Sequence, residues 1–178
     1  MNVIKTKLEG VVIIEPKVFG DHRGFFMETF QKKRYQEEAG ISLEFVQDNF
    51  SSSSRGVLRG LHFQKTKPQG KLVSVSNGEV FDVAVDVRKG SPTFGQWEGV
   101  LLNGDNKRQF YVPPGYAHGF VVLSDMASFE YKCTDYYDPT DEGSVAWDDP
   151  DIGIEWPIED PQLSSKDAAA PMLRDADL

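Results

Sequence analysis

Three histidines, His22, His62 and His118, are the only side chains in the chain that titrate near neutral pH without perturbation. Such a ring suits a general base, and it can also ligate a metal ion. A zinc or iron site in a β-barrel would combine a His-x-His pair with a carboxylate and a third histidine, and this sequence has no such pair. We therefore expect no metal site. For each histidine, a ring held by hydrogen bonds in the core is the structural alternative.

Three cationic side chains stand where they could meet an anion. Arg59 precedes Gly60, and its planar guanidinium matches the geometry of a phosphate, although an exposed ion pair would explain it equally well. Arg23 lies in GDHRGFFME, which is also typical of a solvated turn that enters a strand. Lys71 begins a strand, where a lysine can simply protect a sheet edge from aggregation.

Tyr131 lies in the segment FEYKCTDYY, which has the pattern of a strand. Alternation places Phe129, Tyr131 and Cys133 on one face, and we expect that face to point inward. Tyr131 would then present its hydroxyl to an interior, where a core tyrosine with one hydrogen bond is the alternative. Tyr137 and Phe26 could stack on a flat ligand, although aromatic side chains commonly only fill a core.

The segments that carry these residues resemble short strands. In KLVSVSNGEVFDVAVDV, apolar residues alternate after Asn77-Gly78, a pair typical of a type I′ hairpin turn. Further strands are predicted over Gln96–Leu102, Gln109–Val112, Gly119–Leu123 and Ser128–Thr134. Short strands at intervals of about 8–12 residues favour an antiparallel sandwich or barrel.

Few residues favour helices. The segment Lys32–Ala39 is predicted to be a helix that ends at Gly40, a residue suited to a C-terminal cap, and a second helix is predicted near Ser164–Ala170. We expect Ser51–Ser54 to form a short polar loop. No shift in composition divides the chain, so residues 1–178 are predicted to form one domain.

The composition excludes several classes of partner. The 178 residues include 28 acidic and 19 basic side chains, a net charge of −9, which argues against binding to duplex nucleic acid or an anionic membrane. Cys133 is the only cysteine, which excludes an internal disulfide and fits a reducing compartment. Because neither a signal peptide nor an apolar run of membrane length occurs, we expect a cytoplasmic protein.

Six segments carry a more specific pattern: DHRGFFMETF, FVQDNFSSSSRGVLRGLHFQ, QGKLVSVSNGEVFDVAVDVRKGSPTFGQW, FYVPPGYAHGFVVLSD, YKCTDYYDP and the tail Trp147–Asp167. In this order they resemble the dTDP-4-dehydrorhamnose 3,5-epimerase family. The resemblance implies an all-β, cupin-like jelly roll with a few short helices. Its core would cover about residues 43–137, with an N-terminal arm and a C-terminal helical tail packed on it. The resemblance also implies a homodimer that uses neither a metal nor an organic cofactor.

The substrate that the resemblance implies is a dTDP-4-keto-6-deoxyhexose, and the reaction would convert dTDP-4-dehydro-6-deoxy-D-glucose to dTDP-4-dehydro-L-rhamnose. Carbons C3 and C5 both flank the C4 ketone, so either can lose a proton to form an enolate. Protonation from the opposite face then inverts that centre. This chemistry needs a base, a group that stabilises the oxyanion and an acid across the ring.

The resemblance assigns these roles to residues of this chain. His62 matches the base, Asp167 the carboxylate that orients it, Lys71 the cation beside the C4 oxygen, and Tyr131 the acid. Positions that match substrate-binding residues are Arg23, Phe26, Glu28, Gln47, Asp48, Asn49, Arg59, Lys71, His118, Tyr137, Glu142 and Lys166. In the family, the N-terminal segment reaches the neighbouring subunit's site, so Arg23, Phe26 and Glu28 are expected to act across the dimer. Tyr137 would stack on thymine.

One feature of the sequence opposes this assignment. Arg59 and His62 are three residues apart, so a regular strand would direct them to opposite faces. If both line one pocket, Gly60 must permit a bulge or bend.

Three other functions stay open from the sequence. A relative on the same scaffold would invert only C3 or only C5, or act on another nucleotide-linked keto sugar. A cupin that depends on a metal would be an oxygenase or isomerase. A catalytically silent jelly roll would bind the nucleotide-sugar without exchanging its protons.

Overall fold

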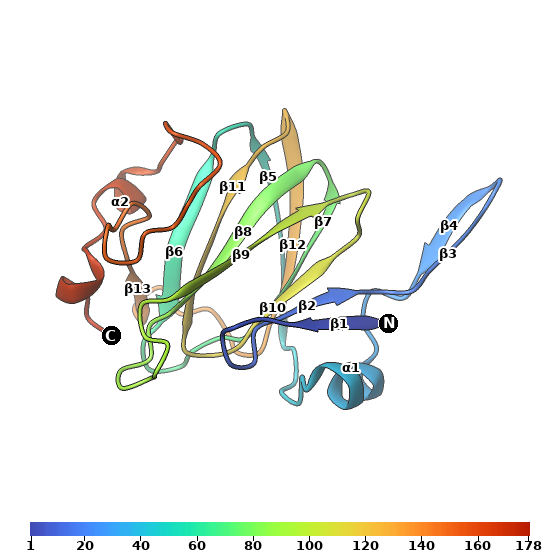
Figure 1. The fold of residues 1–178 in the computed structure, drawn as a ribbon, viewed down its shortest axis with the longest axis horizontal. Coiled ribbons are helices and arrows are strands. Elements are labelled where there is room, and N and C mark those ends of the chain that lie inside the picture. The colour runs from blue at the N-terminus through green and yellow to red at the C-terminus, as the bar shows by residue number, and fades with distance from the viewer.

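Two antiparallel sheets lie face to face in the computed structural model, which describes residues 1–178 (Figure 1). The six-stranded sheet has the order β1 (Asn2–Lys5), β2 (Val12–Glu15), β10 (Gln109–Val112), β7 (Lys71–Asn77), β12 (Met126–Cys133) and β5 (Gln47–Ser54). The five-stranded sheet has the order β13 (Glu142–Ser144), β6 (Leu58–Gln64), β11 (Tyr116–Val122), β8 (Glu79–Asp86) and β9 (Trp97–Asn103). This arrangement confirms the predicted all-β, cupin-like jelly roll. The sheets extend beyond residues 43–137, because β1, β2 and β13 also pair with them.

Apolar side chains from both sheets fill the space between them. Val73 and Phe129 come from the six-stranded sheet, and Val80 and Phe120 from the five-stranded sheet. The rings of Phe120 and Phe129 stack with their centroids 3.9 Å apart. Burial of each such side chain stabilises the fold by about 1.5–3 kcal/mol relative to an exposed one.

The five-stranded sheet is buried on its outer face as well. Val83 and Val85 of β8 pack against Ile152 and Leu173 of the C-terminal segment. The alternation seen in β8 therefore separates two packed layers and does not separate core from solvent. Asp82 precedes Val83 and lies on the opposite face of β8 with Val80 and Ala84, toward the other sheet, where it is completely buried.

Helix α1 (Lys32–Ala39) has the predicted bounds, and Gly40 caps it in the left-handed conformation with φ +71°. Tyr35 anchors the helix, because its ring is buried and its hydroxyl donates to Gln109 Oε1 at 2.7 Å. The predicted C-terminal helix is present but shorter, as α2 (Ser165–Ala168), and a 3-10 turn η1 (Leu173–Asp175) follows it. Neither α-helix is long and apolar enough to cross a membrane.

The hairpin predicted at Asn77-Gly78 is wrong. Strands β7 and β8, which flank this pair, belong to different sheets, so the turn carries the chain from one sheet to the other. A type I′ turn needs positive φ at both central residues, and here only Gly78 has it, at +81°.

The polar loop predicted at Ser51–Ser54 is also wrong, because β5 continues to Ser54. Its residues pair with β12, Ser51 opposite Phe129 and Ser54 opposite Met126. A run of serines does not have the apolar alternation of a strand, yet β5 is an edge strand whose backbone finds its partner in β12.

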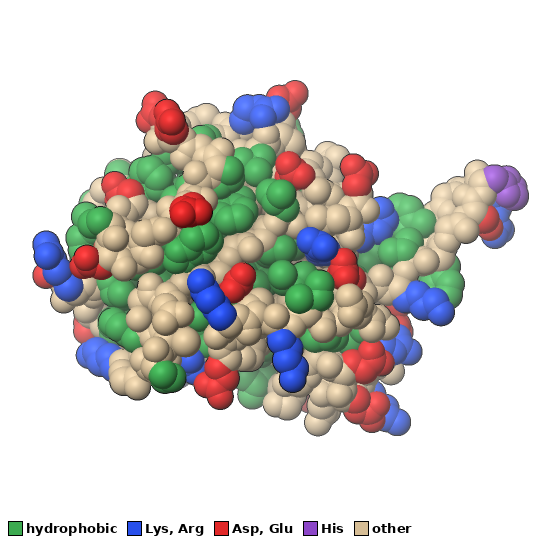
Figure 2. All heavy atoms as spheres, viewed as in Figure 1, with side chains coloured by type: hydrophobic (Ala, Val, Ile, Leu, Met, Phe, Trp, Pro, Cys, Tyr) green, Lys and Arg blue, Asp and Glu red, His purple; other side chains and the backbone are tan.

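Strands β3 (Val18–Asp21) and β4 (Gly24–Met27) form a hairpin that projects from the body of the molecule (Figures 1 and 2). His22 lies in the turn at its tip. Phe19, Phe25 and Phe26 of the hairpin are exposed, with Phe26 at 70%. Apolar surface of this kind on an extended arm is typical of an interaction site.

Candidate active site

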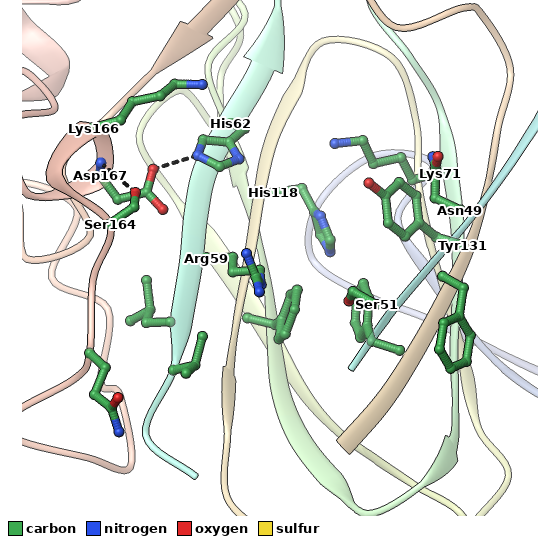
Figure 3. A pocket seen from close by; sticks show the side chains of 16 residues that line it. Asn49, Ser51, Arg59, His62, Lys71, His118, Tyr131, Ser164, Lys166 and Asp167 are labelled. Carbon is green, nitrogen blue, oxygen red and sulfur yellow. Dashed lines mark hydrogen bonds and ion pairs between the residues drawn. The ribbon is translucent and has the colours of Figure 1, made fainter. Parts of the chain in front are cut away.

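A cavity of about 460 Å³ opens between the two sheets, and residues from both sheets and from the C-terminal segment line it (Figure 3). His62 of β6, Lys71 of β7 and Tyr131 of β12 all face it. The same three residues, with Asn49, also line an adjoining cavity of about 180 Å³. The three groups therefore stand at the junction of two connected spaces, large enough together for an extended ligand.

His62 and Asp167 form a pair at one side of this cavity. The His62 Nε2 lies 2.6 Å from Asp167 Oδ1, and the second carboxylate oxygen accepts from the backbone N–H of Gly60 at 3.2 Å. Helix α2 positions the carboxylate, and Ser164 caps it by accepting from the Asp167 backbone N–H. Burial opposes ionisation of Asp167, but the hydrogen bond and charge of His62 outweigh it and hold the pKa of the carboxyl below its usual value. Asp167 is thus an anion that fixes the ring and leaves Nδ1 of His62 on the cavity side (Figure 3).

An irregularity at Gly60 brings Arg59 and His62 to the same cavity. His62 pairs with His118 and Arg59 pairs with Phe120, so the register of β6 against β11 shifts between them. Gly60 has φ +129°, and a Cβ there would lie 2.6 Å from the Cα of Gly119. Only glycine fits this close approach, which confirms the bulge that the spacing required.

Lys71 and Tyr131 lie on adjacent strands across the cavity from the His62–Asp167 pair (Figure 3). The Lys71 Nζ is 5.8 Å from the centre of the Tyr131 ring. Strand β7 lies inside its sheet, so the alternative of edge protection for Lys71 is wrong. Tyr131 does face inward between the buried residues Phe129 and Cys133, as the strand parity predicted.

Burial shifts the pKa values of Lys71 and Tyr131 in opposite directions. It lowers the pKa of Lys71, because the ammonium loses water, although nearby Cys133, Asp82 and Glu142 oppose this. It raises the pKa of the Tyr131 phenol, which stays protonated as a proton donor must be. Lys71 has no carboxylate within 4.0 Å, and the same is true of Arg59, whose guanidinium hydrogen-bonds Ser53 Oγ. Two cations without carboxylate partners therefore face the cavity and favour an anionic ligand.

Several of the expected binding residues lie at or beside the smaller cavity. Lys166 Nζ lies 2.6 Å from Glu142 Oε1, and the Tyr137 hydroxyl donates to the other oxygen of Glu142. This hydrogen bond raises the pKa of Tyr137 to about 12. Gln47 accepts from the Tyr137 backbone N–H at 3.0 Å, so the half-exposed ring is held at the rim of the cavity.

Four of the expected binding residues lie elsewhere in the chain. Asp48 alternates with Asn49 on β5 and points to the outer face of the sheet, where Lys132 pairs with it at 3.1 Å. Arg23 and Phe26 lie on the projecting hairpin, where Arg23 pairs with Asp21. Glu28 follows that hairpin and pairs with Arg34 of α1. The fold of one chain does not bring these four residues to the cavity.

The three histidines do not form one cluster, although His62 and His118 both line the cavity. No group of three His, Cys, Asp or Glu side chains lies together in a way that could hold a metal ion. His62 pairs with Asp167 through Nε2, and its Nδ1 lies 3.8 Å from Glu142 Oε1. His118 pairs with Asp82, and His22 lies in the turn of the hairpin.

Several residues in the cavity wall or buried behind it were not singled out from the sequence. Asp82 is hydrogen-bonded to His118, and Ser51, Gln162 and Ser164 line the wall. A carboxylate inside the apolar run VFDVAV was the available signal for Asp82, since an isolated charge in a buried strand needs a partner. The two serines and the glutamine had no distinguishing pattern.

Comparison with known proteins identifies the family. The family model for dTDP-4-dehydrorhamnose 3,5-epimerase matches residues 5–175. A protein of that name from Salmonella typhimurium strain LT2 is 59% identical over 178 residues, which cover 99% of this chain and 97% of that protein. The chain belongs to the dTDP-4-dehydrorhamnose 3,5-epimerase family. Within this epimerase family, a solved structure from Legionella pneumophila, a dTDP-6-deoxy-D-glucose-3,5-epimerase in complex with dTDP-4-keto-L-rhamnose, is 63% identical. It has a TM-score of 0.96 and covers 99% of this chain and 94% of its own.

The epimerase fold also supports a narrower activity in more distant proteins. A 3'-monoepimerase from Streptomyces bikiniensis, solved in complex with dTDP-quinovose, is 37% identical with a TM-score of 0.89. The alignment covers 96% of this chain and 87% of that one. The scaffold therefore does not by itself determine how many carbons are inverted.

Proposed function

We propose that this chain inverts both C3 and C5 of dTDP-4-dehydro-6-deoxy-D-glucose and yields dTDP-4-dehydro-L-rhamnose. The observation that carries the proposal is that His62, Lys71 and Tyr131 line one cavity, with His62 and Tyr131 from opposite sheets. A hexose ring between them would meet a base on one face and an acid on the other. Membership of the epimerase family supports the same substrate class.

His62 acts first as the base. Its Nδ1 lone pair takes the proton from C5 or C3, and the electrons of that C–H bond form a carbon–carbon double bond to C4. Asp167, hydrogen-bonded to Nε2, stabilises the imidazolium that results. A base positioned in this way contributes about 10²–10⁴-fold to the rate.

Lys71 stabilises the enolate. As the C4 carbonyl becomes an oxyanion, an ammonium without a carboxylate partner gains a stronger interaction than it had with the ketone. One preorganised donor in such a position is worth about 10²–10³-fold.

Tyr131 completes the inversion from the opposite face. Its hydroxyl donates a proton to the carbon while the enolate electrons re-form the C–H bond and the C4 ketone. The cycle leaves an imidazolium and a phenolate, and proton exchange with water restores both. Repetition at the second carbon inverts that centre.

The remaining cavity residues bind the nucleotide. The cations Arg59 and Lys166 supply local positive charge for the diphosphate, even though the chain is acidic overall. Tyr137 at the rim offers a flat ring for thymine, and Gln47, Asn49, His118 and Glu142 supply polar contacts.

A dimer accounts for three of the four residues that lie away from the cavity, and Asp48, paired with Lys132 on the outer face, is the exception. We propose that the β3–β4 hairpin of one subunit extends to the site of its partner, so that Arg23, Phe26 and Glu28 act there. The exposed aromatic rings on the hairpin support this. The single buried Cys133 fits the reducing cytoplasm, which we propose as the location.

The test is incubation of the purified protein with dTDP-4-dehydro-6-deoxy-D-glucose in heavy water. Deuterium at both C3 and C5 of an L-configured product is the expected result. Deuterium at one carbon alone would assign the narrower activity of the Streptomyces bikiniensis relative. Binding of the nucleotide-sugar without any deuterium uptake would refute catalysis.

A further inference from the structure

A second histidine–carboxylate pair lies beside the first. His118 of β11 is the register partner of His62 of β6, so both rings project from the same face of the five-stranded sheet. The His118 Nε2 lies 2.7 Å from Asp82 Oδ1. His118 is 6% exposed and Asp82 is fully buried, whereas the side chain of His62 is 29% exposed. His118 therefore lines the inner part of the cavity, and Asp82 lies buried behind it.

Asp82 is unusual among the buried polar residues. Its Oδ2 is the only buried side-chain nitrogen or oxygen without a hydrogen-bond partner. A carboxylate in this position needs a nearby positive charge, because burial alone would strongly disfavour its ionised form. Burial does raise the pKa of Asp82, and the charges of His118 and Lys71 oppose that rise. Asp82 thus interacts electrostatically with His118 and Lys71, which both line the cavity.

The other ring nitrogen of His118 is available to a ligand. Nδ1 makes no hydrogen bond within the chain. Because Asp82 Oδ2 is the only buried side-chain nitrogen or oxygen without a partner, the unpaired Nδ1 must be accessible from the cavity that His118 lines. With Nε2 directed at Asp82, Nδ1 is the nitrogen that the substrate can reach.

We propose that Asp82 is a positioning residue that holds His118 as a charged hydrogen-bond donor to the C4 oxygen, beside Lys71. Nε2–H donates to Asp82, and Nδ1–H donates to the sugar. The cluster of Lys71, His118 and Asp82 then carries one net positive charge, which the single negative charge of the enolate neutralises. The inference rests on the proposed function and adds a second donor to it.

Asp82 alone can supply the negative charge that this requires. The titratable and charged groups that face His118 from the packed strands are Arg59 and His62 on β6, Lys71 on β7 and Tyr131 on β12. None of these is an anion. Two other carboxylates border the connected cavities, but both are paired elsewhere. Asp167 is hydrogen-bonded to His62 and Gly60, and Glu142 to Lys166 and Tyr137.

The test is Asp82→Asn, with Glu79→Gln on the same strand as the control. The amide oxygen can still accept from Nε2–H, so the ring keeps its place and only the charge is lost. We expect kcat to fall about 10–100-fold, the loss of one charge-assisted donor, while the Kd of dTDP, which lacks the sugar, changes less than threefold. The control, whose carboxylate accepts from Asn103 outside the cavity, is expected to keep wild-type kcat. A kcat for Asp82→Asn equal to that of the parent would overturn the proposal.

A spectroscopic measurement gives a readout that packing alone would not move. In the unsubstituted protein labelled with ¹⁵N-histidine, we expect both His118 nitrogens to carry protons at pH 7, and one to lose its proton in Asp82→Asn. A neutral His118 in the unsubstituted protein overturns the inference even if the variant does not fold. Because this spectrum needs no turnover, it separates the inference from the proposed function, which fails if the parent protein does not take up deuterium at both C3 and C5.

Discussion

Replacement of Asp167 by Asn is the perturbation whose effect the geometry determines most closely. The two carboxylate oxygens accept from two different donors, Nε2–H of His62 and the backbone N–H of Gly60. An amide has one accepting oxygen and one donating nitrogen, so it can satisfy only one of these neighbours. The variant must therefore either leave Gly60 without an acceptor or turn its nitrogen toward His62.

The two outcomes differ in magnitude. If the amide oxygen stays on His62, the ring loses a charge-assisted hydrogen bond worth about 1.5–3 kcal/mol in the transition state, which is about 10–150-fold in kcat. If the amide nitrogen faces His62, Nε2 must become the acceptor and the proton moves to Nδ1, which removes the lone pair that the substrate needs. A wrong tautomer of this kind costs about 10⁴-fold in a serine protease triad. We expect a loss between these limits.

The assay is the initial rate of deuterium uptake at C3 and C5 in heavy water, measured alongside the Kd of dTDP. Both carbons are expected to slow together while the Kd stays within threefold, since Asp167 does not act through the nucleotide. Asp160→Asn, an exposed carboxylate in the same C-terminal segment, is the control and is expected to behave as the parent. A kcat for Asp167→Asn within threefold of the parent would refute the role of the pair.

Three further predictions test the other parts of the site. The Tyr131→Phe variant is expected to remove the sugar protons as the parent does, which is measured as deuterium uptake, but to form at least tenfold less inverted product. An equal decrease in deuterium uptake and in inverted product would show that Tyr131 is not the acid. Burial lowers the pKa of Lys71 from 10.5, so its positive charge is present below that lowered pKa and lost above it. We therefore expect kcat/KM to fall on the alkaline side at a pH below 10.5. The same pH profile in Lys71→Met, or a decrease in its kcat of less than about 10²-fold, would contradict this. Gly60→Ala is expected to lower the free energy of unfolding by more than about 1–3 kcal/mol, because the new methyl would meet Gly119 in addition to the strain of a positive φ. Gly90→Ala, at a φ of +80° with open space around it, is the control without a contact, and equal losses of the two variants in urea denaturation would exclude the close contact.

Sequence patterns predicted correctly those features of the fold that depend only on neighbouring residues. The C-terminal end of α1 follows from Gly40, whose left-handed conformation ends the helix with a hydrogen bond to Tyr35 of the same helix. The inward direction of Tyr131 follows from the period of a strand, since its neighbours Phe129 and Cys133 are apolar. In both cases the information lies within a few residues of the position.

Pairing between distant strands was not available from the same patterns. Asn77-Gly78 suits a hairpin locally, but the hydrogen bonds of β7 are made with β10 and β12 and those of β8 with β9 and β11. The strand β5 exists because β12 offers its edge, and its serines contribute little to that choice. Tertiary hydrogen bonding thus overrides turn and strand propensity at these two places.

The residues of the candidate site divide in the same way. His62, Lys71, Tyr131 and Asp167 were expected from the family resemblance, which also required a bulge that the structure has at Gly60. Asp82 was missed because alternation reports the face of a strand and not whether that face is buried, and β8 is buried on both faces. Only the structure shows that Asp82 is hydrogen-bonded to His118, which lines the cavity.

The most direct measurement is a crystal structure of the protein with a bound dTDP-4-keto sugar. We expect the hexose ring to lie between the His62 imidazole and the Tyr131 hydroxyl, one on each face, with the Lys71 ammonium within hydrogen-bond distance of the C4 oxygen. A ring that contacts both His62 and Tyr131 through the same face, or a C4 oxygen remote from Lys71, would contradict the proposed chemistry.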